Sequence, residues 1–316
     1  MFEVRQLHPL FVGEVSGIDL REPVDDATRD AIVAALDRHA VLVFHDQQLD
    51  DDRQMTFSAT FGPLGQTAIV KRKGYTPRLN PHFTDISNLD ENSEILALND
   101  RRRMMALGNR LWHTDHAFRP VPAKYSLLYA HAVPPEGGET EFTDMRAAYD
   151  ALSDARKARI ADMVAMHSLM YSREVIGFTD FAPEEHAAFP PVPHPLVRTH
   201  PGSGRRALYL AAYASEIRGM PVPDGRMLLR DLTEHATQRQ FVYTHDWRVG
   251  DLLMWDNRSL MHRAGDYDMT QRRDLRRNTV MQDISTMEEK ARASEAVHSD
   301  SAHRPGGSGC QSAMVR

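Results

Sequence analysis

The feature that most constrains this chain is a set of three potential metal ligands that lie far apart in the sequence. His113 and Asp115 are separated by one residue, whereas His262 lies in the second half of the chain. Two neutral imidazoles and one carboxylate can occupy one face of a divalent transition metal and leave the other face open, as in non-haem Fe(II) oxygenases. If the three side chains converge, both halves of the chain must belong to one folded unit.

Strand geometry would bring the near pair together. In a strand over residues 111–115, His113 and Asp115 would share one face while Thr114 points away. A short apolar run at residues 251–255, flanked by turn residues, predicts the distant strand that delivers His262. A His-x-Asp pair alone often arises by chance and would then be a surface pair, but the long-range set favours a metal site.

A basic run follows His262 and includes Arg272, Arg273, Arg276 and Arg277. The planar guanidinium of Arg273 matches a carboxylate bidentately, so it could hold an anionic reactant. In a strand Arg273 and Arg277 would share the pocket face, with Arg272 and Arg276 on the opposite face. The alternative is that this run is a solvated surface and that Arg277 has only a structural role.

Composition excludes several classes of protein. The 316 residues are 41% hydrophobic and 26% charged, which is typical of a globular protein with an ample core. We find no apolar run long enough for a membrane span and no signal peptide. The only cysteine, Cys310, cannot form an internal disulfide, which favours the cytoplasm. A net charge of −6 argues against nucleic-acid binding.

Hydrophobic periodicity predicts more strands than helices after the first 60 residues. Helices are expected at residues 25–38, from 50 or 51 through 57, 144–152, 153 to about 167, and 224–237. Strands are expected at residues 41–44, 84–89, 125–133, 140–143, 196–199, 207–212, 241–244, 251–255 and 278–281. Residues 100–105 are predicted to form a charged loop, and residues 171–195 an irregular loop or lid.

These elements predict a mixed, mainly β fold in which a single sandwich or barrel is wrapped by helices. We find no internal repeat and no linker, and both halves carry candidate ligands. One domain is therefore expected over residues 1–283, followed by a polar, flexible tail at residues 284–316.

The motifs resemble one known family along most of the chain, from residue 7 to residue 283. The similar runs are Leu-Trp-His-Thr-Asp, Gly-Gly-Glu-Thr-Glu-Phe, Leu-Val-Arg-Thr-His, Gly-Asp-Leu-Leu-Met-Trp-Asp-Asn-Arg and Arg-Arg-Asp-Leu-Arg-Arg. They are similar to those of the taurine and 2,4-dichlorophenoxyacetate dioxygenases, which use Fe(II), 2-oxoglutarate and O2 and have a double-stranded β-helix (jelly-roll) core. The phenoxyacetate branch is the most similar.

The resemblance implies a role for each matching position. His113, Asp115 and His262 would bind iron, and Arg273 with Thr140 would hold the distal carboxylate of 2-oxoglutarate. The residues implied near the primary substrate are Arg277 at its acid group, Asn109 near the metal-bound reactants, and Lys71 in a basic loop. His116 departs from the family, whose members carry a small residue there, so it is a further candidate substrate contact.

The resemblance also implies a reaction. An aryloxyalkanoate such as 2,4-dichlorophenoxyacetate would be hydroxylated on the carbon next to its ether oxygen, giving a phenol and glyoxylate with succinate and CO2. A sulfonate or alkyl-sulfate dioxygenase of the same family is the alternative. Two other classes stay open, a zinc hydrolase and a non-catalytic binding module. The expected partner is a small anionic aromatic molecule, and the family implies a homo-oligomer.

Overall fold

The computed structural model describes residues 2–66 and 77–283. Lys71 and the predicted tail at residues 284–316 lie outside the described residues. The chain divides into two compact units, Met1–Met281 and Gln282–Arg316, and all the elements below belong to the first. Among the described helices, none has the length and apolar character that a membrane crossing needs.

The largest sheet has seven strands in the order β1-β2-β3-β13-β5-β15-β4. Neighbouring strands are antiparallel except for β2 and β3. The central strands β3 and β13 are buried along their whole length, so both faces of the sheet are covered. The strands are β1 (Glu3–Gln6), β2 (Gly13–Ser16), β3 (Val41–Phe44), β4 (Phe83–Ser87), β5 (Ala123–Ala132), β13 (Leu252–Asp256) and β15 (Asp274–Met281).

A second sheet, of three strands, packs against one face of the first. Its order is β12 (Val242–His245), β6 (Thr140–Asp144) and β14 (Leu260–Ala264), all antiparallel. The buried cluster between the sheets includes Leu128, Leu253 and Leu275 from the large sheet and Phe142 and Leu260 from the small one. This pair of facing sheets forms the mainly β core that the sequence predicted, and the jelly-roll connectivity stays a prediction.

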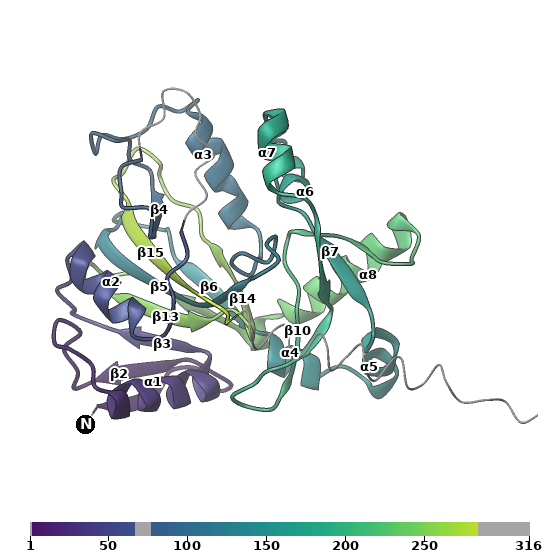
Figure 1. Cartoon of the computed structure of the whole chain (residues 1–316), viewed down its shortest axis with the longest axis horizontal. Helices are drawn as coiled ribbons and strands as arrows, with labels where there is room; N and C mark the ends of the chain where they lie inside the picture. The colour runs from purple at the N-terminus through teal and green to yellow at the C-terminus, as the bar shows by residue number, and fades with distance from the viewer. Residues whose placement is uncertain (1, 67–76, 284–316) are drawn as a thin grey trace, which may run out of the picture. The chain divides into compact units, whose positions relative to one another are not determined.

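Two helices cover the other face of the large sheet. They are α1 (Asp26–His39), capped by Asp25, and α2 (Asp51–Ala59), capped by Asp50. Ile32 and Leu36 of α1 and Phe57 of α2 share a buried cluster with residues of β3, β5 and β13. Both helices lie beside β3 in Figure 1.

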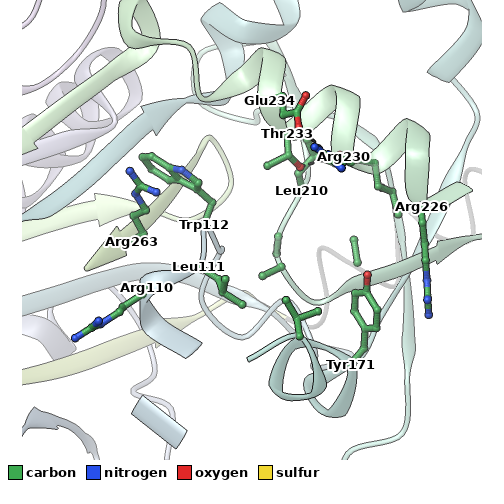
Figure 2. A pocket seen from close by; sticks show the side chains of 15 residues that line it. Arg110, Leu111, Trp112, Tyr171, Leu210, Arg226, Arg230, Thr233, Glu234 and Arg263 are labelled. Carbon is green, nitrogen blue, oxygen red and sulfur yellow. Dashed lines mark hydrogen bonds and ion pairs between the residues drawn. The ribbon is translucent and has the colours of Figure 1, made fainter. Parts of the chain in front are cut away.

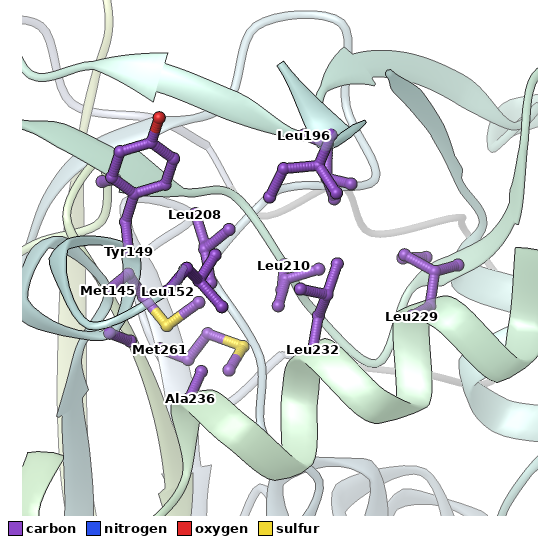
Figure 3. Close-up of a cluster of buried hydrophobic side chains, with 14 of the residues drawn as sticks. Met145, Tyr149, Leu152, Leu196, Leu208, Leu210, Leu229, Leu232, Ala236 and Met261 are labelled. Carbon is purple, nitrogen blue, oxygen red and sulfur yellow. The ribbon is translucent and has the colours of Figure 1, made fainter. Parts of the chain in front are cut away.

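The remaining elements pack on the side of the small sheet, away from α1 and α2 in Figure 1. The helices are α4 (Met145–Asp150), α5 (Asp154–Ile160), α6 (Leu169–Glu174), α7 (Pro183–Ala188) and α8 (Val222–Ala236), with the short η2 (Arg239–Phe241). The strands are β7 (Val164–His167), β8 (Val192–Pro195) and β11 (Ala214–Ile217) in one sheet, and β9 (Val197–Thr199) with β10 (Arg206–Leu208) in a hairpin. Figure 3 shows Leu229, Leu232 and Ala236 of α8 facing Leu208 and Leu210 in a buried apolar cluster.

The structure corrects four expectations. Residues 101–106 form helix α3 (Arg101–Ala106), capped by Asp100, followed by η1 (Leu107–Arg110), and not a charged loop. The helix that Ser153 caps ends at Ile160 and gives way to β7. Residues 171–195, expected to be irregular, contain part of α6 together with α7 and β8. Residues 111–115 make one isolated bridge in place of a strand.

Candidate metal centre and anion site

Three buried side chains that could bind a metal meet at one point in the structure. One ligand atom from each of His113, Asp115 and His262 lies within 4.8 Å of the others. Nε2 of His113 is 3.8 Å from Oδ1 of Asp115, and Nε2 of His262 is 3.7 Å from Oδ2 of Asp115. Two imidazoles and one carboxylate at this spacing suit a divalent transition metal such as Fe(II).

Backbone pairing makes the two histidines neighbours. The N–H of His113 donates to the carbonyl of His262 at 2.9 Å, and the N–H of His262 donates back at 2.8 Å. His262 therefore comes from β14 and not from the strand at residues 251–255, which corrects the prediction. Residues 115–118 form a turn, so Asp115 reaches the two rings through a turn and not through strand alternation.

Hydrogen bonds orient two of the three candidate ligands. Nδ1 of His113 lies 2.7 Å from the carbonyl oxygen of Leu111, and because a carbonyl only accepts, this nitrogen carries the proton and Nε2 is free for a metal. The hydroxyl of Ser126 donates to Oδ2 of Asp115 at 2.7 Å and accepts from the amide of Asn257 at 2.9 Å. Asn257 also accepts from the backbone N–H of Asp115.

The charges of the cluster are those of a metal site. Burial lowers the pKa of His113 and of His262, so both imidazoles are neutral at pH 7. Burial alone would raise the pKa of Asp115, but the positive charges around it, with that of Arg277 the largest, outweigh burial and hold this pKa below its usual range. Neutral imidazoles and an ionised carboxylate are the forms that bind a divalent cation.

Arg277 on β15 lies directly beside the metal cluster. Its guanidinium donates to Oδ1 of Asp115, and its Nε has no hydrogen-bond partner among the described atoms. Arg276, the preceding residue in the chain, faces away and pairs with Asp51 and Asp274. The predicted division of the basic run into a pocket face and an outer face therefore holds for Arg276 and Arg277.

Arg273 is a buried cation that, within the described residues, lacks an acidic partner. Its guanidinium donates to the carbonyl oxygens of Ile86 at 2.9 Å and Gly138 at 3.4 Å, and it lies 5.5 Å from the ring of Tyr267. Its Nε has no partner in the same set of residues, and burial lowers its pKa. A buried guanidinium with spare donors is a site for a carboxylate.

Thr140 begins β6, two residues after Gly138, and its hydroxyl has a partner that the sequence analysis missed. Nε1–H of Trp247 donates to Oγ1 of Thr140 at 2.9 Å. His245 packs edge-on against Trp247, with ring centroids 4.9 Å apart, and is itself held by Asp251. No spacing rule links Trp247 to Thr140, because the two meet only through the pairing of β12 with β6.

Two other residues predicted to contact the substrate, His116 and Asn109, differ in their burial and surroundings. His116 is buried, has a positive φ of 54° and leaves Nδ1 without a partner among the described residues. Burial, with Arg277 and Arg119, lowers its pKa to about 3. Asn109 lies half-buried in η1, and among the described residues its side chain makes no hydrogen bond.

Three aromatic rings, termed here the aromatic wall, extend from the metal cluster. The ring of Tyr213 lies 6.2 Å from that of His113, the ring of Phe118 lies 4.9 Å from that of Tyr213, and the ring of Phe189 lies 5.8 Å from that of Phe118. All three pairs are edge-to-face, which is a favourable aromatic geometry. The wall gives the space next to the candidate ligands an apolar, aromatic boundary.

A groove of about 300 Å³ lies on another part of the surface. Figure 2 shows it between α8, with Arg226 and Arg230, and the segment of Leu111 and Trp112. Among the residues that the structure describes, none of the candidate metal, cosubstrate or substrate residues lines it. It is therefore distinct from the metal cluster.

A second group of ligand-type side chains consists of Asp37, His200 and Asp256. Nε2 of His200 lies 2.9 Å from Oδ2 of Asp256, and Arg258 pairs with Asp256 and approaches Asp37 to 4.0 Å. Because a fixed cation already neutralises these carboxylates, the group is a structural ion pair.

Comparisons with known proteins agree with this site. Residues 3–279 match the family model described as taurine catabolism dioxygenase TauD, TfdA family. The chain is 45% identical, over 88% of its length and 96% of the relative, to the α-ketoglutarate-dependent 2,4-dichlorophenoxyacetate dioxygenase of Cupriavidus pinatubonensis. It is 38% identical, over 86% of its length and 92% of the relative, to an (S)-phenoxypropionate/α-ketoglutarate dioxygenase of Sphingobium herbicidovorans. Among solved structures, AAD-2 in complex with Mn(II) and N-oxalylglycine has a TM-score of 0.82 and 50% identity, covering 89% of this chain and 97% of its own.

Proposed function

We propose that aryloxyalkanoates are the substrates of this chain, which belongs to the TauD and TfdA family of Fe(II)- and 2-oxoglutarate-dependent dioxygenases. The carbon next to the ether oxygen would be hydroxylated, and the resulting hemiacetal would break its bond to the aryl oxygen. For a phenoxyacetate the products are a phenol and glyoxylate, with succinate and CO2 from 2-oxoglutarate and O2. For 2,4-dichlorophenoxyacetate the phenol would be 2,4-dichlorophenol.

In this proposal His113, Asp115 and His262 hold the iron, and Arg273 with Thr140 holds the distal carboxylate of 2-oxoglutarate. Bound iron and 2-oxoglutarate together supply the O2 activation that the amino-acid side chains cannot. The chain contributes neutral imidazoles, an ionised carboxylate and an unpaired buried guanidinium at the places that these reactants need. Because Trp247 already donates to the Thr140 hydroxyl, the proton of that hydroxyl is left to donate to the carboxylate.

The aromatic wall is the observation that favours an aryl substrate over an alkyl one. Tyr213 and Phe118 extend from the ring of His113, so an aromatic ring held there would lie next to the metal. Arg277 and His116 lie at the start of this wall and would contact the acid end of the substrate. Asn109 and Lys71 complete the proposed contacts.

A substrate screen tests the proposal. Purified protein with Fe(II), ascorbate and 2-oxoglutarate is given phenoxyacetates, phenoxypropionates, alkyl sulfonates and alkyl sulfates, and succinate is measured together with phenol, sulfite and sulfate. Succinate and phenol in equal amounts from phenoxy acids are expected, and the His262→Ala variant should form neither. Release of sulfite or sulfate with no phenol would favour the sulfonate or alkyl-sulfate alternative.

A further inference from the structure

Arg119 is a half-buried cation at the outer end of the aromatic wall. Its Cζ lies 5.8 Å from the ring centroid of Phe118 and 6.0 Å from that of Phe189. The turn after Asp115 sets its position, because the N–H of Arg119 donates to the carbonyl of His116 at 2.9 Å. Nε2 of His194 lies 3.2 Å from the carbonyl oxygen of Arg119 and holds the same segment from the other side.

The guanidinium of Arg119 has no acidic partner in the part of the chain that the structure describes. It forms no ion pair there, and its Nε is buried without a hydrogen-bond partner. Burial lowers its pKa, which indicates that the surroundings do not compensate its charge. The two phenylalanine rings supply only the modest attraction of a cation–π contact at the edge of its range.

Two cations therefore bracket the space next to the metal cluster. Arg277 lies at the inner end, where it contacts Asp115, and Arg119 lies at the outer end over Phe118 and Phe189. His116 lies beside the outer cation, because its carbonyl accepts from the N–H of Arg119 and its ring lies 6.0 Å from that of Phe118. A ligand that lies along the aromatic wall would meet a positive charge at both of its ends.

We propose that Arg119 determines substrate specificity by binding an anionic group on the aryl ring, at the position opposite the ether oxygen. This inference rests on the proposed function, because it takes the aromatic wall as the site of the aryl ring. The preferred substrates are then aryloxyalkanoates with an acid at one end and a carboxylate or similar anionic group at the other. An unsubstituted phenoxy acid would leave the guanidinium of Arg119 without its partner.

The test uses two ring-substituted acids of nearly equal size, 4-carboxyphenoxyacetate and 4-carbamoylphenoxyacetate. Their affinities are measured by calorimetry on protein loaded with Mn(II) and N-oxalylglycine, so that no turnover is needed. Wild-type protein should bind the carboxylate about tenfold more tightly than the amide, because both groups accept hydrogen bonds from the guanidinium but only the carboxylate adds an attraction between opposite charges. In Arg119→Met this preference should disappear, whereas Arg119→Lys, which keeps the charge, should retain most of it.

The control is Arg230→Met, which removes an exposed arginine of α8 that pairs with Glu234. It should leave the tenfold preference unchanged. Equal preference for the carboxylate in wild-type protein and in Arg119→Met would overturn the role of Arg119 while leaving the proposed function intact. Failure of wild-type protein to bind or convert any phenoxyacetate would overturn the proposed function, and this inference with it.

Discussion

The indole of Trp247 donates a hydrogen bond of 2.9 Å to the hydroxyl of Thr140, at the edge of the proposed cosubstrate site. An indole N–H can only donate, so it fixes Thr140 as the acceptor of this pair and leaves the Thr140 proton pointing elsewhere. Among the described residues no acceptor receives that proton. The hydroxyl of Thr140 can thus donate a hydrogen bond to a bound anion.

Replacing Trp247 should weaken cosubstrate binding through Thr140. Trp247→Phe should raise the dissociation constant of N-oxalylglycine about fivefold, the effect of one neutral hydrogen bond. In a double-mutant cycle, Trp247→Phe should add little once Thr140→Ala is present, because both changes remove the same interaction. Calorimetry on the Mn(II)-loaded protein measures all four constants, and strictly additive effects would contradict the coupling.

Replacing Arg273 and replacing Arg277 should weaken the binding of different reactants. Arg273→Ala should weaken 2-oxoglutarate binding by about 100-fold or more, because it removes the buried partner of a carboxylate. Arg277→Ala should raise the KM of the aryloxy acid about tenfold with a smaller effect on 2-oxoglutarate. Initial rates with each reactant varied in turn give both constants. Similar small effects of both variants on both reactants would argue against this division of roles.

Ser126 should affect metal affinity although it is not a candidate ligand. Its hydroxyl donates to Asp115 and accepts from Asn257, so Ser126→Ala would release the carboxylate from its fixed orientation. Metal affinity should fall about 10-fold to 100-fold. Ser58→Ala is the control, since Ser58 is equally buried and its hydroxyl donates to Asn278. Mn(II) titration followed by calorimetry or electron paramagnetic resonance gives the affinity, and equal effects of the two variants would exclude the proposed role.

Stability of the metal-free protein should fall in mild acid, in part because of His194. Burial, with Arg198, lowers the pKa of His194 to about 4 from a usual value of 6.5, although carbonyls of Ala117 and Arg119 oppose the shift. Between these two values the unfolded chain binds a proton that the folded chain does not, so folding stability is complete above pH 6.5 and is lost as pH falls towards 4.

The His194→Gln variant shows how much of this loss of folding stability is due to His194. Between pH 7 and pH 5 wild-type protein should lose about 2 kcal/mol more unfolding free energy than the variant. His167 and Arg198 face His194, and both remain in the variant, so the difference belongs to His194. Urea unfolding at the two pH values measures it. Parallel losses in both proteins would show that His194 does not titrate in this range.

Sequence reasoning worked where local patterns decide the structure. A helix was expected over residues 144–152, and the carboxylate of Asp144 accepts from the backbone N–H groups at the start of α4. The apolar periodicity at residues 224–237 gave most of α8, and the continuous apolar run at residues 41–44 gave β3. The resemblance correctly indicated the family, and the structure brings His113, Asp115 and His262 together.

What the sequence could not show depends on contacts between distant segments. The bridge between His113 and His262, the donor that Trp247 provides to Thr140, and the support of Asp115 by Ser126 all join residues that only the fold brings together. The strand β14 was missed because its two polar residues, His262 and Arg263, break the apolar pattern. Helix α3 was missed because its three arginines resemble a solvated loop.

The reciprocal backbone hydrogen bonds between His113 and His262 have a consequence for how the enzyme recovers from loss of its metal. These bonds involve only peptide groups, so a chelator that strips the ion does not remove them. The imidazoles stay side by side in the metal-free protein, because folding has already fixed their positions. Metal binding then costs little further conformational entropy. Reloading should then be as rapid as diffusion and dehydration of the ion permit, without a refolding step.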